Sequence, residues 1–255
     1  MALWRVLRTG YSSAAMNMAI DQAVMEARRE GRVHNTLRVY QWEPSAVSIG
    51  YFQGIEEEVD LNACKKHGVD VVRRLTGAGA VFHDKKGEVT YSIIFGEGDV
   101  ELPGPVKDSY PILCSGIVDG LERLGIEAGF RPINDIVVGE KKISGSAQTR
   151  RWGCILQHGT LLYDVDPRLM FTLLRVPNEK IRDKMIAAVE ERVTSVRHET
   201  GGIVSIQEVE EALIEGFANV LDMDVSSEDL SPGEMERAEE LARNVYASRE
   251  WNFRR

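Results

Sequence analysis

The sequence predicts an α+β fold, in which a mixed β-sheet with flanking helices forms one domain. β-rich segments dominate the first two thirds of the chain, helical patterns follow from about residue 167, and the strict βαβ alternation of doubly wound proteins is missing. With 255 residues, 43% of them hydrophobic and 28% charged, the chain can bury a sizeable core. We expect a single domain over residues 1–255, with a helical C-terminal portion over about 167–255.

Periodicity and turn residues predict the elements of the first half. Apolar side chains recur at helical spacing over residues 14–28, just after two serines that can cap a helix. Two β-rich segments, 36–42 and 46–52, are separated by Glu-Pro-Ser and predict a hairpin or a pair of adjacent strands. A helix over 56–68 and strands over 70–75 and 88–95 are expected next, and the two strands enclose a glycine-bearing loop.

The second half changes from strands to helices. A helix is expected to end near Gly125, and two or three strands joined by turns are expected within 134–166. Helices over 205–221 and 231–246 each open with Ser-x-x-Glu, an arrangement in which the serine and the glutamate cap the first turn reciprocally. This order of elements places the sheet first and most of the covering helices last.

Charge and cysteine usage exclude several classes of protein. A formal net charge of -9 argues against nucleic-acid binding, which needs a basic face. The three cysteines, Cys64, Cys114 and Cys154, show no CxxC spacing, so neither a disulfide framework nor a bound metal is expected. No apolar run is long enough for a membrane span, and a reducing, cytoplasmic location is expected.

The loop TGAGAVFHDKKG is the first chemical candidate. Gly77 and Gly79 lie within a few residues of Arg73, Arg74 and His83. Glycine backbone, which can adopt conformations closed to other residues, therefore lies close to cationic and polar side chains. The loop fits neither GxxxxGK[ST] nor the dinucleotide fingerprint GxGxxG, although another anion site remains open. A simple tight turn explains the two glycines equally well.

The segment NDIVVGEKKISGSAQ is the second candidate. Strand alternation would place Lys141 and Lys142 on opposite faces, one in solvent and one toward a pocket, where it could hold an acyl or phosphate oxygen. Two solvated lysines at a sheet edge are the simpler alternative. Asn134 and Asp135 fit an Asx-turn or a Mg²⁺-linked site, and His158 fits the core or the site.

Three blocks, RRLTGAGAVFHD, NDIVVGEKKISGSAQ and LQHGTLLYD, resemble in order and spacing the signature blocks of the lipoate-protein ligase A family. NMAIDQA, IGYFQ, RVTSVR and EWNFRR extend the resemblance over essentially the whole chain. The resemblance implies a mixed sheet with flanking helices, related to the catalytic domain of biotin-protein ligases. It also implies that lipoate and Mg-ATP give lipoyl-AMP, whose lipoyl group passes to a lysine of an acceptor domain, an E2 subunit of 2-oxoacid dehydrogenases or the glycine-cleavage H protein.

The resemblance also assigns site residues, with Lys142 as the catalytic residue. The implied nucleotide-binding residues are Arg74, Gly77, Gly79, Ala80, Val81, Phe82, Asn134, Asp135 and Lys142. The implied lipoate-binding residues are His83, Lys142 and His158. The chain departs from the family at Ala78, where a glycine triplet is usual, and at its end, where many members continue into an accessory domain. A separately encoded small accessory subunit is therefore expected as a partner.

Two other functions compete with the ligase. An octanoyl or lipoyl transferase of the same superfamily takes its acyl group from a carrier-protein thioester through a cysteine, without ATP. The block FRPINDIVV before the lysines has no cysteine, and Cys154 is the only one close in sequence. The third possibility is a non-catalytic protein that binds the lipoyl ligand or the acceptor domain. The absence of an obvious nucleophile favours the ligase.

Overall fold

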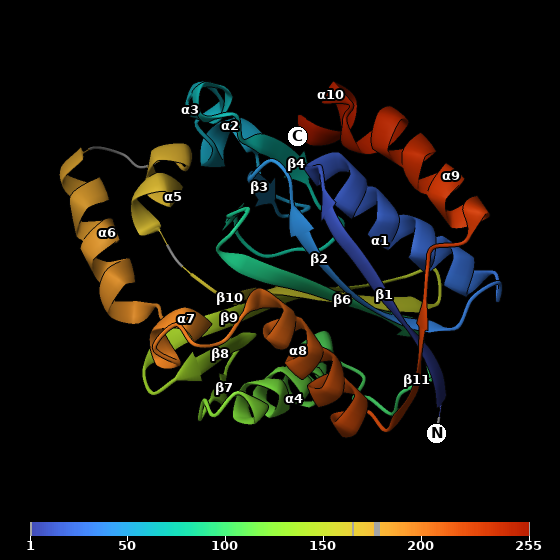
Figure 1. The fold of residues 1–255 in the computed structure, drawn as a ribbon. Coiled ribbons are helices and arrows are strands. Elements are labelled where there is room, and N and C mark those ends of the chain that lie inside the picture. Colours follow the sequence, from blue (N-terminus) through green and yellow to red (C-terminus); the bar gives the residue numbers. More distant parts are fainter. Residues whose placement is uncertain (1, 165, 176–178, 255) are drawn as a thin grey trace.

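The computed structural model describes residues 2–164, 166–175 and 179–254, and its core is a large mixed sheet between two helical layers (Figure 1). The strands are β1 (Ala2–Ser12), β2 (Asn35–Trp42), β3 (Ala46–Ile49), β4 (Asp70–Arg73), β5 (Val81–His83), β6 (Glu88–Gly96), β7 (Gly129–Arg131), β8 (Asp135–Val138), β9 (Lys141–Arg151), β10 (Cys154–Leu162) and β11 (Met223–Glu228). The described residues form an eight-stranded sheet in the order β11-β1-β2-β6-β10-β9-β8-β7 and a three-stranded sheet in the order β4-β3-β5. In the large sheet β1 pairs in parallel with β2 and β11, and the other neighbours pair antiparallel.

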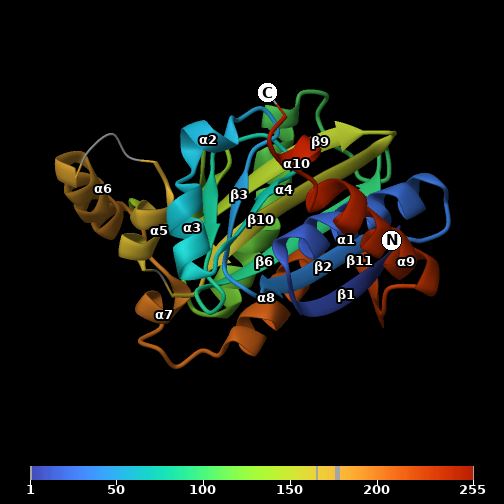
Figure 2. The ribbon, with the colours of Figure 1, turned by 90° about the horizontal axis from the view of Figure 1, so that it is seen from above.

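Helices cover both faces of the large sheet. They are α1 (Ala14–Arg29), α2 (Ile55–Glu58), α3 (Leu61–His67), α4 (Val106–Arg123), α5 (Pro167–Leu173), α6 (Glu179–Arg192), α7 (Val196–Glu199), α8 (Ile206–Val220), α9 (Pro232–Leu241), a π-helical turn (Ala242–Tyr246) and α10 (Arg249–Asn252). α1 and α9 lie together on one face, and α4 and α8 lie on the other (Figures 1 and 2). One apolar core fills each side of the sheet, so the α+β prediction is confirmed.

Capping decides where several helices begin. Ser13 precedes α1, and its hydroxyl accepts a hydrogen bond from the backbone N–H of Met16 at 3.3 Å. The predicted reciprocal caps of α8 and α9 are both present. In each, the glutamate carboxylate accepts a hydrogen bond from the backbone N–H of the capping serine. The apolar face of α1 then packs on the sheet, whereas α9 packs on α1 and α8 packs chiefly on α4.

The sheet differs from the expectation in three places. β2 and β3 are not a hairpin: β2 joins the large sheet, whereas β3 pairs with β4 and β5 in the small one. The glycine-bearing loop contains β5, a strand of its own. β11 was not predicted, because this edge strand is mostly exposed and MDVSSE lacks apolar alternation; pairing with β1 creates it.

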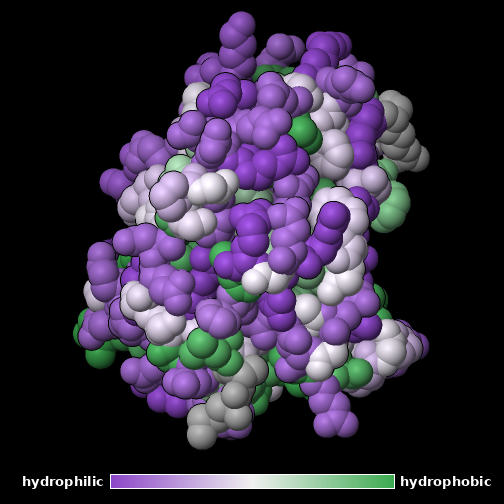
Figure 3. Space-filling model, turned by 90° about the vertical axis from the view of Figure 1, so that its right-hand side faces the viewer, coloured by the Kyte–Doolittle hydropathy of each residue, from purple (hydrophilic) through white to green (hydrophobic). Residues whose placement is uncertain are grey.

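The surface is that of a polar globular protein on the face drawn in Figure 3, where hydrophobic side chains occur in small scattered groups. No helix among the described residues is long and apolar enough to cross a membrane.

Candidate active site

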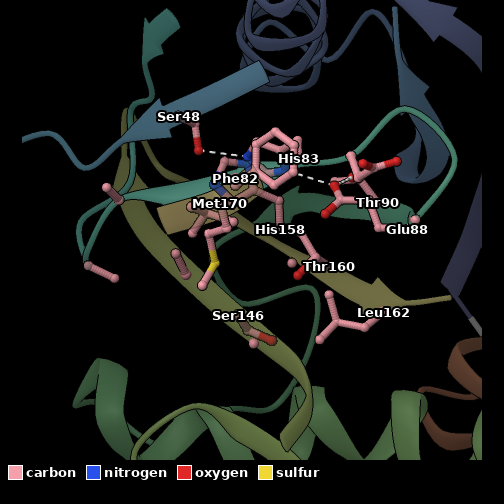
Figure 4. Close-up of a pocket in the computed structure, with 18 of the residues that line it drawn as sticks. Ser48, Phe82, His83, Glu88, Thr90, Ser146, His158, Thr160, Leu162 and Met170 are labelled. Carbon is pink, nitrogen blue, oxygen red and sulfur yellow. Dashed lines mark hydrogen bonds and ion pairs between the residues drawn. The ribbon is translucent and has the colours of Figure 1, made fainter. Parts of the chain in front are cut away.

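A cavity of about 500 Å³ lies where the small sheet meets the large one. Its walls come from β3, the glycine-bearing loop, β6, β8, β9 and β10, and Met170 of α5 and Val189 of α6 contribute to its lining. The predicted site residues that line it are Arg74, Gly79, Ala80, Val81, Phe82, His83, Asn134, Asp135, Lys142 and His158. Gly77 is not among the lining residues. The three sequence blocks therefore converge on one cavity (Figure 4).

Arg74 holds the glycine-bearing loop in shape. It is 4% exposed, and its Nη2 donates to the carbonyl oxygens of Gly77 and Gly79, each at 2.6 Å. Nη1 donates to the carbonyl and the hydroxyl of Ser48, and Nε donates to Thr76. Burial lowers the pKa of Arg74 to about 10. Its donors are directed at the protein's own oxygens.

The backbone freedom of the loop is needed at positions other than the expected glycines. Ala78 has φ 70°, in the left-handed region, whereas neither Gly77 nor Gly79 has a positive φ. Gly50 is required by close approach, since a Cβ there would lie 2.0 Å from the carbonyl oxygen of Ala78. The alanine in place of a family glycine thus occupies the one left-handed position of the turn.

Lys142 reaches the opposite wall from β9. Its Nζ lies 2.7 Å from Asp135 Oδ1, and the two side chains are 39% and 26% exposed. Gly145 makes room for it, because an added Cβ would lie 2.7 Å from Nζ. Asn134 donates its amide to the carbonyl of Ser146 and so ties the start of β8 to β9. Lys141 does not line the cavity.

His158 is held by a buried charge that sequence reasoning missed. Its Nε2 lies 2.7 Å from Thr76 Oγ1, and its Nδ1 lies 3.2 Å from Asp21 Oδ2. Asp21 also accepts from Arg38 Nη1 at 2.7 Å, and both of these side chains are buried. Burial lowers the pKa of His158 and outweighs the opposite effect of the carboxylate. The imidazole is therefore neutral at pH 7.

His83 is fixed from three sides. Its ring stacks on Trp42 with centroids 4.0 Å apart, Nδ1 lies 2.7 Å from Glu88 Oε1, and Nε2 lies 2.8 Å from Ser48 Oγ. Ser48 and Glu88 both line the cavity and were missed. A glutamate at the start of the apolar strand EVTYSIIF was the available signal, because buried carboxylates are rare without a partner.

The three cysteines are buried, and none is among the described residues that line the cavity. Burial raises the pKa of Cys64 and of Cys114 to about 11, and it also raises the pKa of Cys154. Cys114 on α4 contacts a lining residue, with its Sγ 3.5 Å from Oγ of Ser146. All three thiols are protonated near neutral pH.

The fold and the convergent cavity agree with the family match, in which residues 13–218 match the model of the lipoyl protein ligase A/B catalytic domain. The chain belongs to this family. It is 43% identical to octanoyltransferase LipM of Kyrpidia tusciae over 100% of both chains, and 38% identical to that of Geobacillus kaustophilus over 99% of both. A bi-partite lipoate protein ligase of Thermoplasma acidophilum has a similar solved structure, with a TM-score of 0.90, 35% identity, and coverage of 99% of this chain and 97% of that one.

These comparisons overturn the prediction of an ATP-dependent lipoate-protein ligase. Relatives that match over their full length are named octanoyltransferases, so the transferase that was weighed as the alternative fits better. The physical reason is that the signature blocks show only that their residues, a lysine among them, meet around one cavity. They do not specify whether the acyl group arrives as a free acid or as a thioester. The names of these relatives support neither ATP nor Mg²⁺ as substrates.

Proposed function

We propose that this chain transfers an octanoyl group from a carrier-protein thioester to the lysine of a lipoyl-acceptor domain, without ATP. The observation that carries the proposal is similarity to octanoyltransferases over at least 99% of the chain. E2 lipoyl domains and the glycine-cleavage H protein have the acceptor chemistry required. A thioester is already activated, so this reaction needs neither adenylation nor an accessory subunit. We infer that the enzyme works in the cytoplasm, where such carriers and acceptors occur.

The cavity suits a medium-length acyl chain. Phe82, Leu162 and Met170 line it with apolar surface, and Figure 4 shows them around the same space as the polar residues. Each methylene taken from water contributes about 0.8 kcal/mol to binding. The polar wall that includes Lys142 would then face the acyl carbonyl.

The reaction replaces a carbon–sulfur bond by a carbon–nitrogen bond. Each attack on the acyl carbonyl forms a tetrahedral intermediate with negative charge on oxygen, which a preorganised donor stabilises. Lys142 supplies an ammonium in the cavity, and Asp135 at 2.7 Å orients it. Arg74 was expected to face a nucleotide, but its donors are engaged by Ser48, Thr76 and the loop carbonyls. This arrangement supports a reaction without a phosphate.

Mass spectrometry of an acceptor domain tests the proposal. The purified chain is incubated with the acceptor and either octanoyl carrier protein or free lipoate with Mg-ATP. Octanoylation from the carrier protein without nucleotide is expected. Modification only from the free acid, and only with ATP, would refute the transferase.

A further inference from the structure

Three segments that lie far apart in the chain meet in a group of aromatic and cationic side chains, which we call the aromatic patch: Tyr51, Phe52, Arg151, Trp251 and Arg254. Arg151 and Arg254 lie over the ring of Tyr51, with their guanidinium carbons 4.2 and 3.7 Å from its centroid. Arg254 also lies 4.1 Å from the ring centroid of Trp251, and the ring of Phe52 meets that of Tyr51 edge-on. Phe52 is 74% exposed. Rings and guanidinium groups are thus presented to solvent together.

Arg73 ties the backbone under the patch together. Its side chain is buried, and its guanidinium donates over 2.6–3.1 Å to the carbonyl oxygens of Gly50, Tyr51, Gln53, Trp251, Asn252 and Arg254. α10 also packs against β4, the strand that carries Arg73 (Figure 1). The C-terminal segment is therefore fixed beside residues 50–53, and the patch is a built part of the fold.

Trp152 follows Arg151 in the turn between β9 and β10 and adds a further exposed ring. Its φ is 55°, in the left-handed region, which suits glycine or asparagine in such a turn and strains a bulky side chain. The residue is 42% exposed, so burial within the fold does not offset the strain. A large ring held in solvent at this position indicates contact with a partner.

The charge of the patch is opposite to that of the chain, whose formal net charge is -9. Within the described part of the chain, neither Arg151 nor Arg254 forms an ion pair with a carboxylate, whereas arginines such as Arg8, Arg123 and Arg197 do. The two cations stay available to carboxylates of another protein. An acidic partner is repelled by the chain as a whole, so it needs a local cationic surface of this kind to approach. Arginine and aromatic side chains are also the residues most enriched at protein interfaces.

The patch adjoins the substrate cavity on the side of the glycine-bearing loop. Gly50, next to Tyr51, packs directly on the carbonyl oxygen of Ala78, a lining residue, and the N–H of Tyr51 donates to the carbonyl of Thr76 at 2.8 Å. An acceptor lysine has only a four-carbon stem, so its domain has to cover the mouth of the cavity itself. A carrier protein holds its acyl group on a long flexible arm and can dock beside the mouth. The position of the patch therefore favours the acyl donor.

We propose that the aromatic patch is the docking surface for an acidic face of the octanoyl carrier protein. This inference rests on the proposed transferase function. Carboxylates of the carrier pair with Arg151 and Arg254, and apolar side chains of the carrier cover the rings of Phe52 and Trp152. The patch lies outside the cavity, so it governs the binding of the donor and leaves the chemical steps of transfer untouched.

Kinetics with two donors test the proposal. The full chain is assayed with octanoyl carrier protein and with octanoyl-N-acetylcysteamine, a small thioester that has no protein to dock. The double variant Arg151→Glu/Arg254→Glu should raise the KM for the carrier by about tenfold or more, because like charges then face each other. The kcat with the carrier, the kinetics with the small thioester and the KM for the acceptor domain should not change. Unchanged kinetics with the small thioester also show that the variant is folded.

A matched control and a binding measurement separate docking from net charge. Lys65→Glu/Lys66→Glu makes the same change of charge on exposed residues of α3, outside the patch, and should leave the KM for the carrier unchanged. The Kd of a fluorescently labelled octanoyl carrier protein is measured by anisotropy. Salt at about 1 M, which screens charges beyond about 3 Å, should weaken binding to the wild-type chain and narrow its difference from the Arg151→Glu/Arg254→Glu variant. Trp152→Asn should weaken carrier binding while it raises the free energy of unfolding, a combination that a merely structural tryptophan would not give.

The outcomes distinguish the docking surface from the function on which it rests. Equal KM and Kd for the carrier in the wild-type chain and in Arg151→Glu/Arg254→Glu would overturn the docking surface and leave the transferase standing. A rise in the KM for the acceptor domain, with that for the carrier unchanged, would overturn it too. If the wild-type chain binds the carrier through the patch but transfers nothing from either thioester, the transferase is wrong and the docking surface stands.

Discussion

Removing the ammonium of Lys142 tests the placement of the site. Lys142→Met keeps most of the aliphatic stem and deletes the charge that faces Asp135. The two side chains are 39% and 26% exposed, so their ion pair contributes at most about 1 kcal/mol to folding. Loss of a donor to the tetrahedral oxyanion costs far more, about 10²–10³-fold in rate, or about 2.7–4 kcal/mol. Activity should therefore fall steeply while stability hardly changes.

Two measurements are compared for this variant. The octanoyl-transfer rate is followed by acceptor mass, and the free energy of unfolding comes from denaturant titration. Lys141→Met is the matched control, because Lys141 lies next in the chain and does not line the cavity. A transfer rate within a few-fold of wild type in Lys142→Met, or an equal loss in Lys141→Met, would refute the assignment.

Three further perturbations follow from the packing. Gly50→Ala should displace the glycine-bearing loop and abolish octanoyl transfer, because the carbonyl oxygen of Ala78 would lie 2.0 Å from the new Cβ. Gly129→Ala is the control: a Cβ there meets no atom within 4 Å, so the octanoyl-transfer rate should not change. Asp21→Ala should lower the free energy of unfolding by about 3–5 kcal/mol in denaturant titration, because the buried Arg38 loses its counter-charge. Since burial depresses the pKa of His158, its contribution to stability is complete above about pH 6.5 and is lost as the pH falls through the lowered value. His158→Gln should flatten the unfolding free energy in that acid range, and an unchanged slope would contradict the neutral imidazole.

Much of the architecture could be predicted because its causes are local. The caps of α8 and α9 depend on residues three positions apart, and both formed as expected. The loop and the lysine strand were also singled out by composition and spacing, and both line the same cavity. Edge strand β11 could not be predicted, since its hydrogen-bonding partner lies more than 200 residues away in the chain.

The sequence motifs do not identify the acyl donor. A lysine beside an apolar cavity serves a lipoyl adenylate and an octanoyl thioester alike, because both present an acyl carbonyl that becomes an oxyanion. The glycines suggested a phosphate site, yet Arg74 donates to the carbonyls of that loop instead. Full-length similarity to octanoyltransferases decided against the ligase.

By itself, the sequence determined the α+β class, the family, the helix caps, and the two segments that meet at the cavity. Only the tertiary structure showed that Ser48 joins His83 and Glu88, and that Asp21 supports His158. Ser48 and His83 are 35 residues apart, and Asp21 and His158 are 137 apart. The physical reason is that periodicity and capping act within a few residues, whereas these contacts depend on strand register and on which helix covers the sheet.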